Sequence, residues 1–151
     1  MQVIIMQGVS GSGKSFHGAQ IAREFGAVVV SADTFPGLYG PGGSFNIGLL
    51  GAAHGDCFKR TIEALQAGES VVVDNTNTTT LEVAPYVQAA QAFGATPRIV
   101  RVNCEAGKAL ARNTHGVPEA GHAGQVARLA AFEPAFHWQF IEGFEIDEIE
   151  N

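Results

Sequence analysis

The sequence predicts a three-layer α/β fold, in which a central parallel sheet of four to five strands is flanked by helices. Three observations support this prediction. Short apolar runs alternate with longer segments of helical periodicity along most of the chain. A glycine-rich segment at 8–15 separates the first apolar run from the first helical segment. Asp33 and Asp74 each follow an apolar run, at the edge where parallel strands end and ligands bind.

Four short segments predict the strands, of which the first is a continuous apolar run typical of strands buried on both faces of a parallel sheet. The strands are expected at residues 2–6, 28–30, 71–73 and 98–103. The 151 residues contain no repeat, low-complexity tract or linker, so a single domain is expected over 1–151. That length is enough to bury a sizeable core.

Apolar residues spaced three and four positions apart predict the helices, and glycines or proline-containing segments end them. The helices are expected at 15–25, at 49–66, through 83–90, at 105–112, at 125–131 and, as a last short helix, at 134–143. The polar run 75–80 would cap the third helix, with Pro85 in or near its first turn. The break at 113–118 predicts a helical lid at about 112–124.

Residues 36–48 contain five glycines and no regular periodicity. A connection of this length is long for a compact domain, which favours a binding loop or lid, although an ordinary flexible connection stays open. The aromatic residues Tyr39, Phe45 and Tyr86 are expected either to stack on a base or to pack in the core or loop.

Residues 8–15 match the nucleotide phosphate-binding pattern, in which two glycines separated by four residues precede Lys and then Ser or Thr. Glycines let consecutive backbone N–H groups point at one phosphate chain, and the following helix adds its positive end. Lys14 is expected to reach the β- and γ-phosphates, and the Ser15 hydroxyl to ligate Mg²⁺. The residues expected to bind the nucleotide are Gly8, Ser10, Gly11, Ser12, Gly13, Lys14 and Ser15.

Two aspartates follow predicted strands that end at the same edge of the sheet as this loop. Asp74 follows three valines, where a carboxylate would orient Mg²⁺, although a plain turn cap stays open. Asp33 follows the second strand, where a carboxylate could orient an acceptor hydroxyl and take its proton, or could simply cap a turn. Asn75 and Asn77 are expected to bind phosphate or acceptor, or to cap the next helix.

Arg112 and Arg128 flank the predicted lid. An arginine on a closing segment would offset the negative charge that builds up on a transferred phosphoryl group, whereas exposed arginines otherwise only solvate a helix face. Lys108 and His115 are weaker candidates in the same region. His54 lies in line with the apolar positions of its helix and is expected to be a packing residue.

The net charge of −6 is concentrated at one end, because residues 142–151 hold five acidic and no basic side chains. This acidic C-terminal tail is expected to be solvated and frayed. The rest of the chain is nearly neutral, which excludes nucleic-acid binding by bulk charge but not a local basic channel. Two cysteines, no membrane-length apolar stretch and no signal sequence predict a soluble, cytoplasmic protein without membrane contact.

These segments together resemble the polynucleotide-kinase-like branch of the P-loop kinases over nearly the whole chain. The most specific motifs are Asp-Asn-Thr-Asn-Thr-Thr-Thr at 74–80 and Arg-Asn-Thr-His-Gly-Val-Pro at 112–118. The resemblance implies ATP-dependent phosphorylation of a hydroxyl, often a nucleic-acid 5′-hydroxyl. It also implies Asp33 as the general base and Arg112 as a lid arginine that contacts the nucleotide. The chain departs from the family at Pro36, where polynucleotide kinases carry an arginine that holds the acceptor's phosphate.

The sequence therefore favours an enzyme that moves the γ-phosphoryl group of ATP, as its Mg²⁺ complex, to a hydroxyl of a nucleic acid or nucleotide. A strand 5′-end and a hydroxymethylated base in DNA both fit, since kinases of phage origin that act on such bases belong to the same broad group. A small-metabolite or nucleoside kinase is the first alternative. A nucleotide-dependent binding module that hydrolyses ATP slowly and has no acceptor is the second.

Overall fold

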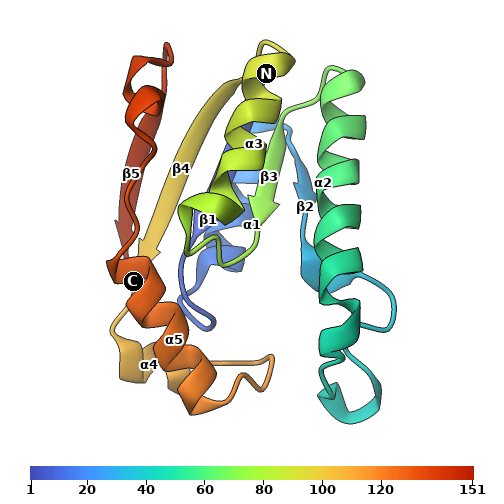
Figure 1. Cartoon of the computed structure of the whole chain (residues 1–151), viewed down its shortest axis with the longest axis vertical. Coiled ribbons are helices and arrows are strands. Elements are labelled where there is room, and N and C mark those ends of the chain that lie inside the picture. The colour runs from blue at the N-terminus through green and yellow to red at the C-terminus, as the bar shows by residue number, and fades with distance from the viewer.

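The computed structural model describes residues 1–151 and contains a five-stranded, fully parallel sheet with the order β2-β3-β1-β4-β5. The strands are β1 Gln2–Gln7, β2 Val28–Val30, β3 Val71–Asp74, β4 Thr96–Asn103 and β5 Glu145–Glu150. The helices are α1 Lys14–Phe25, α2 Leu50–Gln66, α3 Thr80–Ala92, α4 Ala106–Ala111 and α5 Glu119–Ala130. The predicted α/β fold is confirmed (Figure 1).

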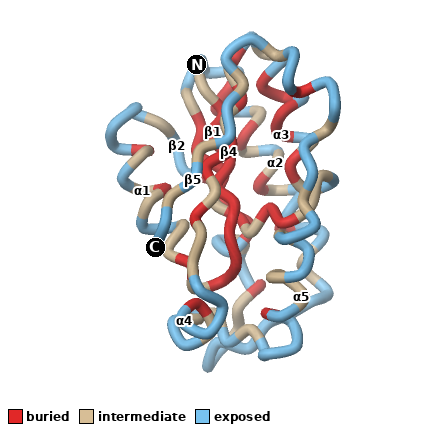
Figure 2. Tube along the Cα trace, turned by 90° about the vertical axis from the view of Figure 1, so that its left-hand side faces the viewer, coloured by how far each residue is buried: buried red, intermediate tan, exposed pale blue.

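Helices cover both faces of the sheet, which gives the three predicted layers; Figure 2 shows the sheet between α1 on one side and α2 with α3 on the other. The larger hydrophobic cluster, of 19 buried residues, includes residues of α2 and α3. A smaller cluster of six buried residues lies between the sheet and α1. Val3, Ile4 and Ile5 of the central strand β1 have no exposed surface, and burying such a side chain contributes about 1.5–3 kcal/mol. This core fixes the carboxyl ends of the strands, near which α4 and α5 lie.

The acidic end of the chain is ordered as a strand, so its prediction as a frayed tail (142–151) is wrong. β5 pairs in parallel with β4 over its whole length. Asp147 accepts a hydrogen bond from Arg98 Nε at 2.5 Å, and Ile149 packs against the smaller core cluster. The other acidic side chains of β5 are exposed, which lets a strongly charged segment form the edge of a sheet.

Loop 36–48 carries more structure than its glycine content predicts. Two 3₁₀ turns lie at Pro41–Gly43 and Ile47–Leu49, and an isolated antiparallel bridge joins Tyr39 to Phe45. Leu38 is fully buried and anchors the loop in the larger core cluster. The loop therefore presents its aromatic side chains from a fixed base.

The C-terminal helices differ from their predicted bounds. The break after α4 is present, but α5 begins at Glu119 rather than at 125, directly after Pro118. The expected last helix at 134–143 is a short 3₁₀ turn over Phe136–Phe140. None of the helices combines the length and the apolar character that crossing a membrane requires.

Helix α3 begins with a capping box, in which Thr79 Oγ1 accepts from Glu82 N and the Glu82 carboxylate accepts from Thr79 N. This confirms the cap expected from the polar run before the helix. Pro85 lies in the second turn of α3 rather than in or near the first, and its side chain is exposed.

Candidate active site

The glycine-rich loop curls between β1 and α1 in the way its residues predict. Gly11 and Gly13 have left-handed φ angles of 81° and 96°, which side chains disfavour. Gly11 also lies directly against the carbonyl of Ala109 in α4, which leaves no room for a Cβ atom. α1 begins at Lys14, so its unpaired N–H groups and its positive dipole end face the loop. The loop is therefore a ready cradle for a phosphate chain.

Helix α5 is hydrogen-bonded to this loop at Ser10. His122 Nε2 lies 2.9 Å from Ser10 O, and His122 is buried. Gln125 Oε1 accepts from Ser10 N at 2.8 Å, while Gln125 Nε2 donates to Ser10 Oγ at 3.1 Å. The spacing of His122 and Gln125 places them on one helix face, but nothing in the sequence indicates that this face meets the loop.

Lys14 and Asp74 are the charged groups at the cradle. Burial lowers the pKa of Lys14 below its ordinary value of 10.5, and the carboxylates of Asp74 and Asp33 oppose this shift. Asp74 Oδ1 and Ser12 Oγ are buried without a hydrogen-bond partner, which is costly unless a ligand completes them. The unpartnered Asp74 carboxylate, which acts on Lys14, fits a cation at the cradle. No three His, Cys, Asp or Glu side chains form a metal-binding cluster.

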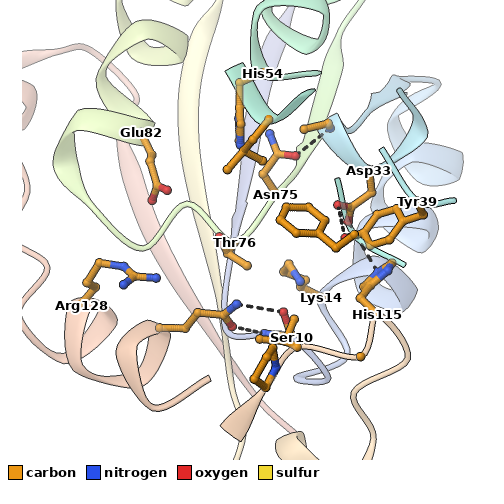
Figure 3. A pocket seen from close by; sticks show the side chains of 17 residues that line it. Ser10, Lys14, Asp33, Tyr39, His54, Asn75, Thr76, Glu82, His115 and Arg128 are labelled. Atoms are coloured by element: carbon orange, nitrogen blue, oxygen red, sulfur yellow. Dashed lines mark hydrogen bonds and ion pairs between the residues drawn. The ribbon is translucent and has the colours of Figure 1, made fainter. Parts of the chain in front are cut away.

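Two cavities meet at Lys14. The larger, of about 310 Å³, lies between loop 36–48, the start of α2, the end of β3 and α5 (Figure 3). The smaller, of about 230 Å³, is bordered by Gly11, Gly13, Lys14, Ser15, Arg112, Thr114 and His115. Lys14 and His115 border both cavities. A phosphate chain along the glycine-rich loop would therefore end where the larger cavity begins.

Asp33 borders the larger cavity from the 3₁₀ turn that follows β2. The Tyr39 hydroxyl donates a hydrogen bond to Asp33 Oδ1 at 3.1 Å, and His115 Nε2 lies 3.5 Å from Asp33 Oδ2. The rings of Tyr39 and His115 stack with their centroids 5.1 Å apart. Burial, together with the charge and hydrogen bond of Asp33, raises the pKa of Tyr39 from 10.0 to about 12. Loop 36–48 and the segment between α4 and α5 thus meet on this carboxylate.

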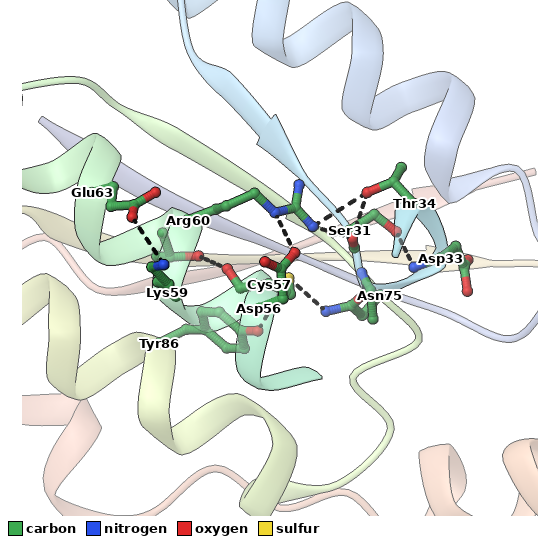
Figure 4. Close-up of polar contacts among 12 residues, drawn as sticks. Ser31, Asp33, Thr34, Asp56, Cys57, Lys59, Arg60, Glu63, Asn75 and Tyr86 are labelled. Atoms are coloured by element: carbon green, nitrogen blue, oxygen red, sulfur yellow. Dashed lines mark hydrogen bonds and ion pairs between the residues drawn. The ribbon is translucent and has the colours of Figure 1, made fainter. Parts of the chain in front are cut away.

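A hydrogen-bond network behind Asp33 holds its turn in place (Figure 4). Asn75 Oδ1, just beyond β3, accepts from the buried N–H of Ala32 at 2.9 Å. Arg60 of α2 donates through Nη2 to Ser31 O at 2.7 Å. The two residues that follow β2 are therefore tied to the end of β3 and to α2, and these bonds fix the position of Asp33.

The other end of the Asn75 amide lies against a buried thiol. Asn75 Nδ2 is 3.5 Å and Tyr86 OH is 3.4 Å from Cys57 Sγ, and both donate to it. Burial and the Cys57 contact raise the pKa of Tyr86 above its ordinary value, so its phenol is neutral. Tyr86 therefore supports the network from the core and does not stack on a ligand.

The sequence itself matches a known family. A family model described as an AAA domain matches residues 3–132. The chain belongs to this family. Among curated proteins, no match to the sequence was found.

Solved structures show that this AAA domain has the P-loop kinase fold. A gluconokinase from Sinorhizobium meliloti 1021 is 19% identical with a TM-score of 0.63, and the match covers 99% of this chain and 82% of that one. A candidate kinase from Chloroflexus aurantiacus J-10-fl is 16% identical with a TM-score of 0.69, covering 99% and 84%. A chain of the Pnkp1/Rnl/Hen1 RNA repair complex is 19% identical with a TM-score of 0.72, covering 86% of this chain and 44% of that one. The predicted P-loop kinase fold is confirmed.

Within this AAA domain the two predicted arginines lie on different cavities. Arg112 borders the smaller cavity, where its Nη2 lies 3.1 Å from Cys104 Sγ. Arg128 borders the larger cavity, and its Nε donates to Thr78 Oγ1 at 3.3 Å. Both guanidinium groups are anchored by a single contact and are otherwise exposed, so each is available to a ligand on its own side of Lys14.

His54 of the AAA domain is exposed and borders the larger cavity, so its interpretation as a packing residue is wrong. Its spacing does match the apolar stripe of α2, but the start of that helix extends beyond the core. Lys108 borders neither cavity. Gly8 and Ser12 support the loop from behind, where Gly8 N donates to Thr76 O at 3.0 Å and Ser12 N to a loop carbonyl.

Proposed function

We propose that this AAA domain transfers the γ-phosphoryl group of ATP to a hydroxyl of a nucleic acid or nucleotide. The observation that carries the proposal is the meeting of the two cavities at Lys14, with Asp33 on the side away from the glycine-rich loop. A phosphate cradle next to a second pocket that contains a carboxylate is what transfer to a hydroxyl requires. A site that only hydrolyses ATP needs no such second pocket.

Each residue has a role that follows from its place. The loop amides and Lys14 bind the β- and γ-phosphates, and Ser15 with Asp74 holds Mg²⁺, which neutralises phosphate charge when bound. Asp33 orients the acceptor hydroxyl and takes its proton as the new bond forms. Arg112 approaches from the phosphate side and offsets the charge that develops in the transition state.

The walls of the larger cavity favour an acceptor with an aromatic base. Tyr39, Phe45 and His115 present ring faces or edges to it, and Tyr39 lies 5.6 Å from Phe45 and 5.1 Å from His115 between centroids. Bases stack on such side chains. The volume of about 310 Å³ is at the small end of ligand pockets, which suits one nucleoside unit of a strand or a free nucleotide. Arg128 borders this cavity and would bind the phosphate of the acceptor, the role that an arginine plays in polynucleotide kinases at the position of Pro36.

A small-polyol acceptor is the second candidate. The gluconokinase has the same fold over nearly all of this chain, and the cavity also offers polar groups suited to hydroxyls, from Asn75, Thr76 and Gln125. We place either reaction in the cytoplasm, because ATP-dependent transfer needs the intracellular nucleotide supply.

Radiolabelled transfer separates these functions. The protein is incubated with Mg²⁺ and ATP labelled at the γ-phosphate, together with 5′-hydroxyl DNA and RNA oligonucleotides, DNA containing a hydroxymethylated base, nucleosides, gluconate and common sugars. We expect label on a nucleic acid or nucleotide. Label confined to sugars or sugar acids supports the second candidate, and label found only as free phosphate contradicts kinase function.

A further inference from the structure

The Tyr39 hydroxyl already occupies the place that an acceptor hydroxyl would take. It donates to Asp33 Oδ1 at 3.1 Å, the same bond through which a general base would align an incoming alcohol. Tyr39 also borders the larger cavity together with Lys14 and Asp33. Figure 3 shows Tyr39 and Asp33 on the same side of this cavity, with the Lys14 side chain directed into it.

The geometry points to Tyr39 as a self-phosphorylation site, which accepts the γ-phosphoryl group of ATP when no external acceptor is bound. This inference rests on the proposed function, because it uses the same cradle and the same base. It adds an acceptor whose identity is known, whereas the external acceptor has to be found by screening.

The step balances without any further reactant. The Tyr39 phenol oxygen forms a bond to the γ-phosphorus while the bond from that phosphorus to the bridging oxygen breaks, and ADP leaves. The phenol proton passes to the Asp33 carboxylate. Tyr39 is a neutral phenol near pH 7, since its pKa lies at about 12, so transfer needs the base.

The surroundings of Tyr39 favour this residue over Tyr86 and Thr34, whose hydroxyls are bonded to other groups. The sequence contains only two tyrosines, and Tyr86 is buried with its hydroxyl on Cys57. The hydroxyl of Thr34, next to Asp33, donates a hydrogen bond to Ser31 O. The Tyr39 hydroxyl, in contrast, bonds to the Asp33 carboxylate itself, and Tyr39 borders the same cavity as Lys14.

The test needs only the purified chain, Mg²⁺ and ATP labelled at the γ-phosphate, with no acceptor added. We expect up to one phosphate per chain, stable to both acid and alkali as phosphotyrosine is, and located on Tyr39 by mass spectrometry of peptides. Acid-labile label would indicate a histidine instead, and alkali-labile label a serine or threonine. An acceptor identified by the screen should slow this labelling, because both hydroxyls need the same Asp33 oxygen.

Three variants complete the test. Tyr39→Phe keeps the ring and its stacking and should lose the label, and Asp33→Asn should reduce the labelling rate at least about 100-fold. Ser44→Ala removes a hydroxyl of the same loop, one that bonds to Pro41 O and not to Asp33, and should keep the label. Unfolding midpoints by circular dichroism confirm that each variant is folded.

The possible failures are distinguishable. Transfer to an external acceptor without phosphotyrosine overturns the self-phosphorylation site and leaves the proposed function intact. Equal labelling of Tyr39→Phe and the unchanged chain also overturns it. Absence of label from the protein and from every acceptor overturns both.

Discussion

Replacing Asn75 with alanine tests the hydrogen bond that ties the turn of Asp33 to β3. The change removes the acceptor of the Ala32 N–H, and Ala32 is only 3% exposed. A buried donor left without a partner costs about 1–3 kcal/mol. Because Asn75 borders the larger cavity, water can partly replace it, and we expect about 1–2 kcal/mol. For a domain of this size, that loss lowers the midpoint of thermal unfolding, followed by circular dichroism, by about 3–6 °C.

A second asparagine provides the matched control. Asn46 Oδ1 also accepts a backbone N–H, that of Gly48 at 3.1 Å, but this bond is exposed to solvent. Asn46→Ala should therefore change the unfolding free energy by less than about 0.5 kcal/mol. Equal midpoints for Asn75→Ala and Asn46→Ala would refute the reasoning that burial makes the Asn75 bond important.

Three further outcomes are expected. Gln125→Ala removes both bonds to Ser10 and should weaken Mg·ATP binding by up to about tenfold; an unchanged dissociation constant in titration calorimetry would argue against α5 as a support of the loop. Gly11→Ala places a Cβ atom against α4 at a left-handed φ and should abolish ATP binding. The control Gly26→Ala also has a left-handed φ, but its Cβ meets nothing within 4 Å, so it should lower only the free energy of unfolding, by about 1–2 kcal/mol. Absorbance titration should show Tyr39 ionising near pH 12. Because the pKa of Tyr39 is higher in the folded than in the unfolded chain, the free energy of unfolding should fall between pH 10 and 12. Tyr39→Phe should remove the contribution of Tyr39 to this fall.

The sequence was sufficient for features that depend on local chain chemistry. A continuous apolar run ends at the glycine-rich loop, and only glycine suits the left-handed positions 11 and 13 without strain. Asp33 and Asp74 could be placed near this loop because parallel strands all end at one edge of the sheet. The break between α4 and α5 could be located because Pro118 and its neighbours interrupt the helical periodicity.

Features that depend on contacts between distant segments could not be predicted. Ser10 and Gln125 are 115 residues apart, and nothing in either segment indicates the other. The contact of His115 with Asp33 likewise requires the folded position of the segment between α4 and α5. The acidic residues of β5 disguise it as a solvated tail, whereas in the fold it pairs with β4 and its half-buried Ile149 packs against the core.

The most direct test of the account compares Asp33→Asn with Lys14→Ala in the transfer reaction, using whichever acceptor the screen identifies. We expect Asp33→Asn to bind Mg·ATP as the unchanged chain does but to transfer phosphate about 100- to 10,000-fold more slowly. Lys14→Ala should lose both binding and transfer. Full activity of Asp33→Asn would contradict the assignment of this carboxylate as the base that serves the larger cavity.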